Sequence, residues 1–359
     1  MKTKPTSGLT RNEAGLFSLG EGNTPLVKSK SIGPSLGIPN LYFKLENLNP
    51  TGSYKDRFAS FLVRDMIAKR QKTCMATSSG NTGAALAAYS AAAGISCTIL
   101  VVDGAPLPKL RQMQLYGAQL LMIRDFGKSA KTTESVFSAL QELSDRYELP
   151  LPISAYKFCP EGMRGVETLA HEIVDSLDEP AEIFVPAGGG GLTLAVAKGI
   201  LSRSEGWKVH CVQPEGNDTI ASSLRNGKAA QPVTRSTTSV SGLQVANVID
   251  GQEVIGACTK TGGTGYVVTD DNAFKWHREL AMREGIFSEP AGAVALAGLE
   301  DAVRRRETDP AGHYVCLVTG SGFKDMATVE SKFSLPDISL LSAGTAIDHL
   351  QKIFDKTQP

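Results

Sequence analysis

Lys55 is the side chain with the clearest chemical potential in this sequence of 359 residues. The strand-like run Tyr42–Glu46 and the turn Asn49–Gly52 precede it, and apolar residues at three- and four-residue spacing predict that a helix follows. Ser53 and Asp56 are typical of a capping box, which predicts Ser53 at the N-cap and Lys55 in the first helical turn. A helix N-terminus disfavours an ammonium ion, so it favours the neutral amine that attacks an aldehyde. Because most lysines are solvent-exposed, the position becomes informative only together with the motifs below.

Two loops that suit anions each stand between a predicted strand and a predicted helix. Ser78–Gly83 supplies hydroxyls, an amide and the free N–H groups of a helix start, although Ser and Asn are also the preferred caps of an ordinary helix. Gly188–Gly191 follows the strand-like run Ile183–Pro186, and its successive N–H groups can form an anion-binding nest. This run lacks the features of nucleotide and dinucleotide loops, so a small phosphate monoester is expected rather than ATP or NAD.

The turn Thr319–Gly322 follows a further apolar strand, Val315–Val318. If the strands are parallel, this turn lies at the same sheet edge as Gly188–Gly191, where a hydroxyl could meet a heteroaromatic nitrogen. A hydroxyl stabilises a protonated ring nitrogen less than a carboxylate does. Thr319 or Ser321 in that role therefore predicts a largely unprotonated ring.

The elements that must position these residues are short β-branched runs alternating with helix-length amphipathic segments, as is typical of parallel sheets built from βαβ units. The clearest unit is strand Thr73–Ala76, helix Asn81–Ala93 and strand Ser96–Val102. No flexible linker interrupts the pattern, so two interleaved domains are expected rather than two in series. The later segments are Lys109–Tyr116, Gln119–Ile123, Ile183–Val185, a helix from Leu192, Val209–Gln213, Tyr266–Thr269, Pro290–Arg306 and Val315–Thr319.

Composition excludes several classes of protein. Lys+Arg and Asp+Glu number 37 each, so the net charge is zero and no sequence-independent affinity for nucleic acid is expected. The hydrophobic content of 42% is that of a folded globular protein, and no stretch is apolar enough to predict a membrane span. The six cysteines have no paired spacing, so we expect buried, reduced thiols in a cytoplasmic protein that binds neither nucleic acid nor membrane. The five histidines have no metal-ligand spacing, and no metal site is expected.

These motifs, in this order, resemble the fold-type II pyridoxal-phosphate enzymes, the tryptophan-synthase-β-like superfamily, across nearly the whole chain. Gly22–Leu26 is similar to the opening motif of that family, Asn49–Arg57 to its cofactor-lysine segment and Ser78–Gly83 to its asparagine loop. Thr319–Asp325, which reads Thr-Gly-Ser-Gly-Phe-Lys-Asp, is similar to the threonine-synthase version of the last segment. Threonine synthase is therefore the branch that the sequence resembles most.

The resemblance implies a role for individual residues. Lys55 would form the internal imine with pyridoxal 5′-phosphate, Asn81 would hydrogen-bond the cofactor's 3′-oxygen, and Thr319 would face the pyridine nitrogen. The glycine run would hold the cofactor phosphate, and the asparagine loop would hold the substrate carboxylate. The cofactor residues expected are Lys55, Asn81, Gly188, Gly189, Gly190, Gly191, Leu192 and Thr319, and the carboxylate-binding residues expected are Ser78, Ser79, Gly80 and Thr82.

Two departures from the threonine-synthase pattern bear on the substrate. Threonine synthases carry an Asn and an Arg just before the Glu-Gly that opens the next helix, and these bind the substrate phosphate. Here Ser154–Pro160 precedes that Glu-Gly, and Cys159 takes the arginine position. Lys157 or Arg164 could replace the missing groups. The unbroken glycines and Glu289–Ala293 are instead similar to serine and threonine dehydratases.

The first hypothesis is a pyridoxal-phosphate-dependent lyase, threonine synthase or a close variant, which performs γ-elimination on O-phosphohomoserine and then adds water at Cβ. The alternatives are a serine or threonine dehydratase, a β-replacing enzyme such as cysteate synthase, or a degenerate member that binds amino acids without catalysis. The fold expected is α/β, with two interleaved three-layer domains, mostly parallel sheets and the cofactor in the cleft between them. Residues 1–57 and 157–359 would form the larger domain, residues 58–156 the smaller domain that closes on substrate, and the chain would form a homodimer.

Overall fold

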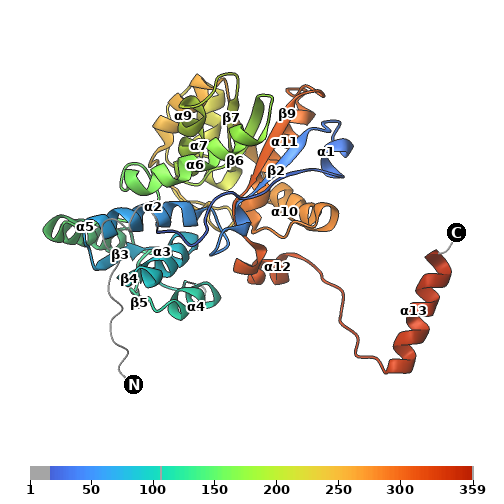
Figure 1. Cartoon of the computed structure of the whole chain (residues 1–359), viewed down its shortest axis with the longest axis horizontal. Coiled ribbons are helices and arrows are strands. Elements are labelled where there is room, and N and C mark those ends of the chain that lie inside the picture. The colour runs from blue at the N-terminus through green and yellow to red at the C-terminus, as the bar shows by residue number, and fades with distance from the viewer. Residues whose placement is uncertain (1–16, 106, 358–359) are drawn as a thin grey trace. The chain divides into compact units, whose positions relative to one another are not determined.

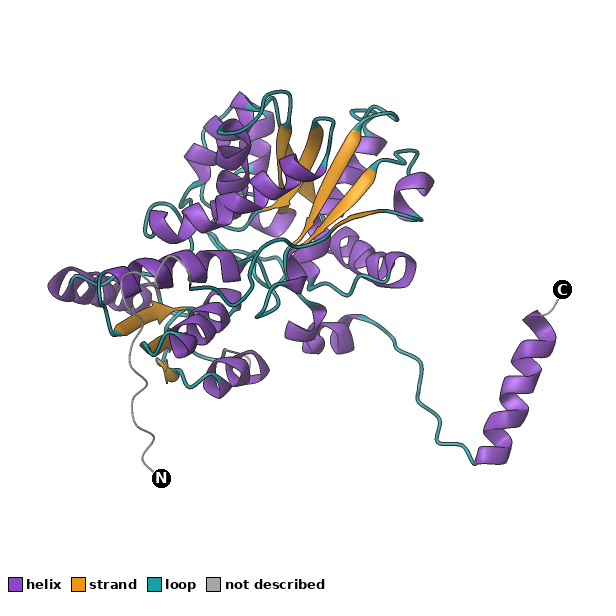
Figure 2. Ribbon diagram, viewed as in Figure 1, coloured by secondary structure: helices purple, strands orange, loops and turns teal. Residues whose placement is uncertain are grey.

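The computed structural model describes residues 17–105 and 107–357, in which strands and helices alternate along the chain (Figure 2). Residues up to Asp325 form one compact unit, which contains every strand of the described chain. Residues from Met326 form a second unit with two helices, α12 (Met326–Lys332) and α13 (Ala343–Thr357). No helix in the described ranges combines the length and the apolar character needed to cross a membrane.

The larger sheet consists of β1 (Leu26–Lys28), β2 (Leu41–Leu45), β6 (Ala181–Pro186), β7 (Lys208–Pro214), β8 (Gly265–Val268) and β9 (His313–Val318). The strand order is β1-β2-β9-β6-β7-β8, and every neighbouring pair except β1 and β2 is parallel. Nearly all residues of β6, β7 and β9 are buried, as expected for parallel strands that are covered on both faces.

Two groups of helices cover this sheet (Figure 1). In the first group, α6 (Pro160–Ser176), α7 (Gly191–Leu201) and α9 (Gly251–Lys260) pack together, and α7 and α9 contact the strands. In the second group, α11 (Val294–Arg304) contacts β6 to β9, and α10 (Asp270–Glu279) packs on α11. The short helices α1 (Ile32–Ser35) and α8 (Ala221–Arg225) complete the set.

The smaller sheet is parallel and has the order β3 (Thr73–Thr77), β4 (Ser96–Val101) and β5 (Gln119–Met122). Its helices are α2 (Lys55–Ala68), α3 (Asn81–Ala92), α4 (Leu107–Leu115) and α5 (Ala130–Tyr147). Helix α2 packs both on α3 and on α6 (Figure 1), and one cluster of buried apolar side chains joins these helices and α7 to strands of both sheets. The close approach of α2 to α6 depends on Gly165, where a Cβ would lie 2.2 Å from the Arg57 carbonyl oxygen.

The predicted α/β class with mostly parallel sheets is confirmed, as is the βαβ unit that begins at Thr73. The segment Pro290–Arg306 of the predicted alternation is helical, with a 3-10 turn over Pro290–Ala293 before α11 begins. A π-helical turn at Leu280–Glu284, which extends α10, was not predicted. All six cysteines are buried and unpaired, as the sequence predicts.

Candidate active site

Lys55 is the first residue of helix α2, and its side chain lies among polar neighbours. Its Nζ is 2.6 Å from the Tyr54 hydroxyl oxygen and 2.7 Å from the Ser154 hydroxyl oxygen. Burial lowers the pKa of Lys55 to about 7, although the nearby Glu289 carboxylate opposes this shift. A substantial fraction of the amine is therefore neutral near pH 7, which is the form that attacks a carbonyl carbon.

The predicted capping box at Ser53 is absent, which corrects the expected helix start. Tyr54 is the N-cap residue, and Ser53 instead forms a bridge with the backbone of Gly320. The Asp56 carboxylate accepts from the backbone N–H and the hydroxyl of Thr51, and the backbone of Ser53 adds a smaller contribution that also lowers the pKa of Asp56. The Ser53 hydroxyl itself makes no capping bond. Pairing with a distant strand end has therefore replaced the local cap.

Asn81 and Thr319 meet on one carboxylate, that of Glu289. The Asn81 amide donates to both carboxylate oxygens, at 3.1 and 2.9 Å, and the Thr319 hydroxyl donates to Oε1 at 3.0 Å. Lys55, from the start of α2, feels the charge of the same carboxylate. Three predicted cofactor residues from α2, α3 and the end of β9 are thus brought together around Glu289, which sequence reasoning did not place in the site.

The glycine run Gly188–Gly191 lies between the end of β6 and the start of α7. Because β6 pairs in parallel with β9, the run and Thr319 follow the same edge of the sheet, as predicted. Gly190 has a φ of +96°, a conformation that favours glycine. Leu192 is the second residue of α7 and is buried, so the run ends in the electropositive first turn of a helix.

Ser154 contacts both Lys55 and the glycine run. Sequence analysis noted the segment Ser154–Pro160 only because it departs from the threonine-synthase pattern, and it did not assign Ser154 to the site. Its hydroxyl oxygen lies 2.7 Å from Lys55 Nζ and 3.3 Å from Thr82 Oγ1. Its carbonyl oxygen lies 2.7 Å from where a Cβ on Gly191 would stand. We call Tyr54, Lys55, Asn81, Thr82, Ser154, Glu289 and Thr319 the Lys55 cluster.

The loop of Ser78, Ser79 and Gly80 leads into this cluster through Thr82. The Gly80 N–H donates to the Ser78 hydroxyl at 3.2 Å, and Gly80 is the N-cap residue of α3. All three loop residues are partly exposed. The structure therefore places accessible hydroxyl and N–H groups at the helix start whose first turn contains Thr82, and binding of a carboxylate there stays a prediction.

Lys157 and Arg164 are not brought to the Lys55 cluster. Lys157 is exposed, with its Nζ 5.6 Å from the centre of the Phe158 ring. The Arg164 side chain is 63% exposed and pairs with Glu161 at 3.0 Å on the same helix. Within the described chain, the contacts given for both side chains are with neighbours in sequence, and binding of substrate by either stays a prediction.

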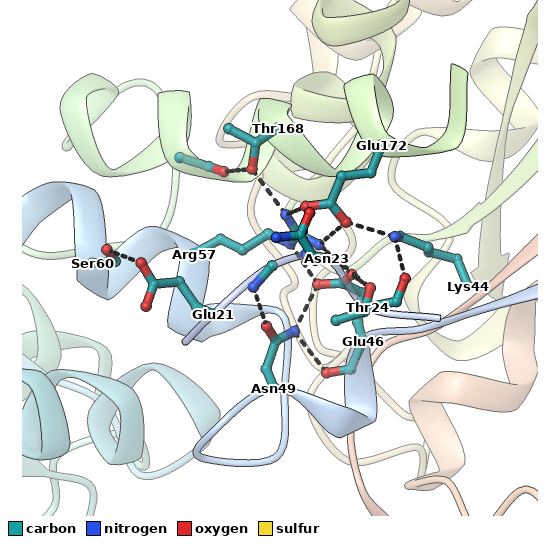
Figure 3. A network of polar contacts seen from close by, with 12 residues as sticks. Glu21, Asn23, Thr24, Lys44, Glu46, Asn49, Arg57, Ser60, Thr168 and Glu172 are labelled. Carbon is teal, nitrogen blue, oxygen red and sulfur yellow. Dashed lines mark hydrogen bonds and ion pairs between the residues drawn. The ribbon is translucent and has the colours of Figure 1, made fainter. Parts of the chain in front are cut away.

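A buried charge network fixes the first turn of α2 (Figure 3). The Arg57 guanidinium contacts Glu46 at 2.8 Å and Glu172 at 2.6 Å, and Lys44 contacts Glu172 at 2.6 Å. Burial alone would raise the pKa of Glu172, but hydrogen bonds from Arg57 and Lys44 hold it at about 2. Arg57 is two residues after Lys55 and links Glu46, at the end of β2, to Glu172 on α6. The network therefore fixes the position of the first turn of α2, where Lys55 lies.

Comparison with known proteins shows which family this chain resembles in sequence and structure. Residues 17–320 match the family described as pyridoxal-phosphate dependent enzyme. A threonine synthase of Halalkalibacterium halodurans is 30% identical over 344 residues, 94% of this chain and 93% of that protein. A threonine synthase of Methanosarcina acetivorans is 33% identical over 320 residues, 86% of this chain and 76% of that protein. A solved structure of serine racemase from Dictyostelium discoideum is 25% identical with a TM-score of 0.71, covering 87% of this chain and 96% of that one.

The chain belongs to the pyridoxal-phosphate dependent enzyme family, with fold type II, and pyridoxal phosphate is its cofactor. The residues present fit this group. Lys55 supplies an amine of lowered pKa, and the glycine run at the start of α7 suits a phosphate. In addition, the Ser53 hydroxyl, two positions before Lys55, is buried and has no hydrogen-bond partner among the described residues.

Proposed function

We propose that this chain catalyses the threonine-synthase reaction or a close variant, in which a γ-substituted amino acid loses its γ-group and gains water at Cβ. O-phosphohomoserine is the first substrate proposed. The observation that carries the proposal is the convergence of Lys55, Asn81 and Thr319 beside Gly188–Gly191. The whole-length similarity to threonine synthases supports it.

Each residue of the proposed site has a separate task. Pyridoxal phosphate, when bound, supplies an electron sink for the charge that develops at the substrate Cα. Lys55 would hold the cofactor covalently through Nζ and, once released by the substrate amine, move protons from Cα and then Cβ. Asn81 would hold the 3′-oxygen, Thr319 would face the ring nitrogen, and Gly188–Leu192 would bind the phosphate. A pKa of about 7 suits Lys55 Nζ for accepting and returning protons near neutral pH.

The substrate carboxylate is proposed to bind the loop Ser78–Gly80 together with Thr82. This loop follows β3 of the smaller sheet, within residues 58–156, which we propose as the smaller domain inserted between residues 1–57 and 157–359. Binding of the carboxylate would draw the loop toward Lys55, since Thr82 and Lys55 already share the Ser154 hydroxyl. Closure of that kind excludes water from the reacting atoms.

One observation favours a second candidate, a β-elimination or β-replacement on a serine- or threonine-like substrate. A phosphate dianion in a closed site needs charged donors. Cys159, at the position of the threonine-synthase arginine, is a buried thiol whose pKa burial raises to about 11, so it is neutral near pH 7. Lys157 and Arg164 contact only neighbours in the described chain, so they would have to turn toward Lys55 to replace that arginine.

One assay separates the candidates. The purified protein, reconstituted with pyridoxal phosphate, is incubated with O-phosphohomoserine, and separately with serine, threonine and O-phosphoserine, and phosphate, threonine and 2-oxoacid are measured. Threonine and phosphate from O-phosphohomoserine alone support the first proposal. Oxoacid from serine or threonine, without turnover of O-phosphohomoserine, supports the second. Lys55→Ala serves as the inactive control, and a protein that turns over none of them while binding amino acids is the non-catalytic member.

We also propose that the chain forms a homodimer, as the resemblance implies, and that it is located in the cytoplasm, as its composition suggests. Light scattering coupled to gel filtration tests the homodimer. A monomer at micromolar concentration contradicts it.

A further inference from the structure

Tyr54 has no task in the proposed mechanism, although its hydroxyl contacts the reacting amine. The Tyr54 hydroxyl oxygen lies 2.6 Å from Lys55 Nζ, and the same Nζ lies 4.3 Å from the centre of the Tyr54 ring. Consecutive side chains of a helix do not face one another, so this contact is not a consequence of helix geometry alone. It is a specific feature of the site.

Both the backbone and the ring of Tyr54 are held in place. Its N–H donates to the Thr319 carbonyl oxygen at 3.1 Å, and its carbonyl oxygen accepts from the Arg57 N–H at 3.1 Å. Its half-buried ring packs against the cluster of buried apolar side chains that joins α2, α3 and α6. The Tyr54 hydroxyl therefore has a fixed position, whereas a lysine side chain is long and has many rotamers.

Lys55 Nζ lies between two hydroxyls that reach it from different segments. The second is that of Ser154, at 2.7 Å, in the segment before α6. A hydroxyl both donates and accepts, so it can bind the lone pair of the neutral amine as well as the ammonium ion. Burial lowers the pKa of Lys55 to about 7 and raises the pKa of Tyr54, so both forms of the amine occur near pH 7 while the phenol keeps its proton.

We infer that Tyr54 is a positioning residue whose hydroxyl, together with that of Ser154, holds the free Lys55 amine in one place before and after it accepts a proton. The Tyr54 hydroxyl donates to the neutral amine and accepts from the ammonium ion. This inference rests on the proposed function, in which Lys55 is released by the substrate amine and then moves protons at Cα and Cβ. An amine held in this way stays beside the reacting atoms, and a misplacement of about 1 Å can cost roughly a hundredfold in rate.

Tyr54→Phe is the direct test, because it removes the hydroxyl and keeps the ring. With the substrate that the wild type turns over, we expect kcat to fall about tenfold or more, and KM and the affinity for pyridoxal phosphate to change less than about twofold. Attachment of pyridoxal phosphate to the apoprotein, followed by stopped-flow absorbance, should slow by a similar factor. Tyr314→Phe removes a buried hydroxyl that accepts from the Asp309 N–H at 2.7 Å, and this control should leave all four values unchanged.

Ser154→Ala and the double variant complete the design. The double variant should lose more than the product of the two single losses, because one hydroxyl still holds the amine in each single variant. Losses that simply multiply overturn the inference, as do unchanged rates in Tyr54→Phe or a fall in kcat matched by an equal loss of cofactor affinity. The proposed function stands in all three cases. Cofactor that borohydride reduction attaches to a lysine other than Lys55 overturns the proposed roles and the inference together.

Discussion

The backbone N–H of Tyr54 donates to the carbonyl oxygen of Thr319 at 3.1 Å, which joins the start of helix α2 to the end of strand β9. The Ser321 N–H donates to the Gly52 carbonyl oxygen at 2.9 Å, and Ser53 and Gly320 form a bridge between these two bonds. The residues just before Lys55 therefore pair, through their backbone, with the end of β9 that carries Thr319. A site fixed in this way should keep its shape when single side chains are replaced.

The lowered pKa of Lys55 sets the pH dependence of cofactor attachment. Only the neutral amine reacts, so the rate of attachment to apoprotein should rise about tenfold per pH unit below pH 7 and level off above it. Stopped-flow absorbance measures the rate, and a free lysine derivative with the same cofactor is the control. A profile for the protein that keeps rising to the ordinary lysine value of 10.5 contradicts the shift.

Asp56 should make the protein less stable as pH rises toward neutrality. Burial raises its pKa from 3.8 to about 7, against the lowering effect of hydrogen bonds from Thr51, so between these values the folded state holds a proton that the unfolded state has lost. The free energy of unfolding therefore falls with pH across this window, by at most roughly 1.4 kcal/mol per unit. Lys55 acts in the opposite sense and only above its folded pKa of about 7.

Urea denaturation at several pH values between about 4 and about 7 measures this slope. Asp56→Asn should flatten it, because the variant has no proton to lose. Asp65→Asn, which removes a carboxylate paired with Lys69 on the same helix, should leave it as in the wild type. Parallel slopes for wild type and Asp56→Asn would show that Asp56 ionises at its ordinary pH.

Arg57 should contribute far more to stability than Arg64, which lies two turns later on α2. Arg57→Met keeps the volume of the side chain but leaves Glu46, which is 0% exposed, without its cation, and we expect a loss of about 3–5 kcal/mol. Arg64 is 28% exposed and pairs with Glu21, so Arg64→Met should lose about 1 kcal/mol or less. Equal losses in urea denaturation would contradict the central position of Arg57 in the network of Figure 3.

Gly191→Ala should weaken cofactor binding by about tenfold or more. Its Cβ would lie 2.7 Å from the Ser154 carbonyl oxygen, so the glycine run and the segment beside Lys55 must separate. Gly256→Ala on α9 is the matched control, because nothing lies within 4 Å of a Cβ there, and it should add about 0.5–1 kcal/mol of stability with unchanged cofactor affinity. Fluorescence titration with pyridoxal phosphate measures both affinities, and equal values contradict the close contact.

The positions of the site residues at strand ends could be predicted from sequence for a physical reason. Asn81 follows β3, Gly188–Gly191 follow β6 and Thr319 follows β9, and the ends of parallel strands gather at one edge of a sheet. Short apolar runs and glycine-rich turns are local sequence patterns. They therefore predicted the loops after β3, β6 and β9 without any information about how the elements pack. The α/β class followed from the same alternation.

Tertiary contacts explain what sequence reasoning missed. Glu289 enters the site because Gly320 leaves room for its carboxylate, and Ser154 enters because Gly191 has no side chain. Both are contacts between segments far apart in the chain, and no periodicity marks them. The helix start was misplaced for a similar reason, since the backbone of Ser53 pairs with Gly320 instead of capping α2. Sequence analysis also did not divide the chain at Met326, where the second unit begins.

The strand order has a consequence for synthesis of the chain. β9 lies between β2 and β6, yet among the strands of the described residues it is the last to be made. Until the ribosome has released His313–Val318, β2 and β6 each present an open edge with no partner, and such edges pair readily with other chains. A nascent chain therefore cannot complete its larger sheet, or bring Thr319 beside Tyr54, until β9 has left the ribosome. Messages truncated before this strand should yield aggregating protein rather than a smaller enzyme.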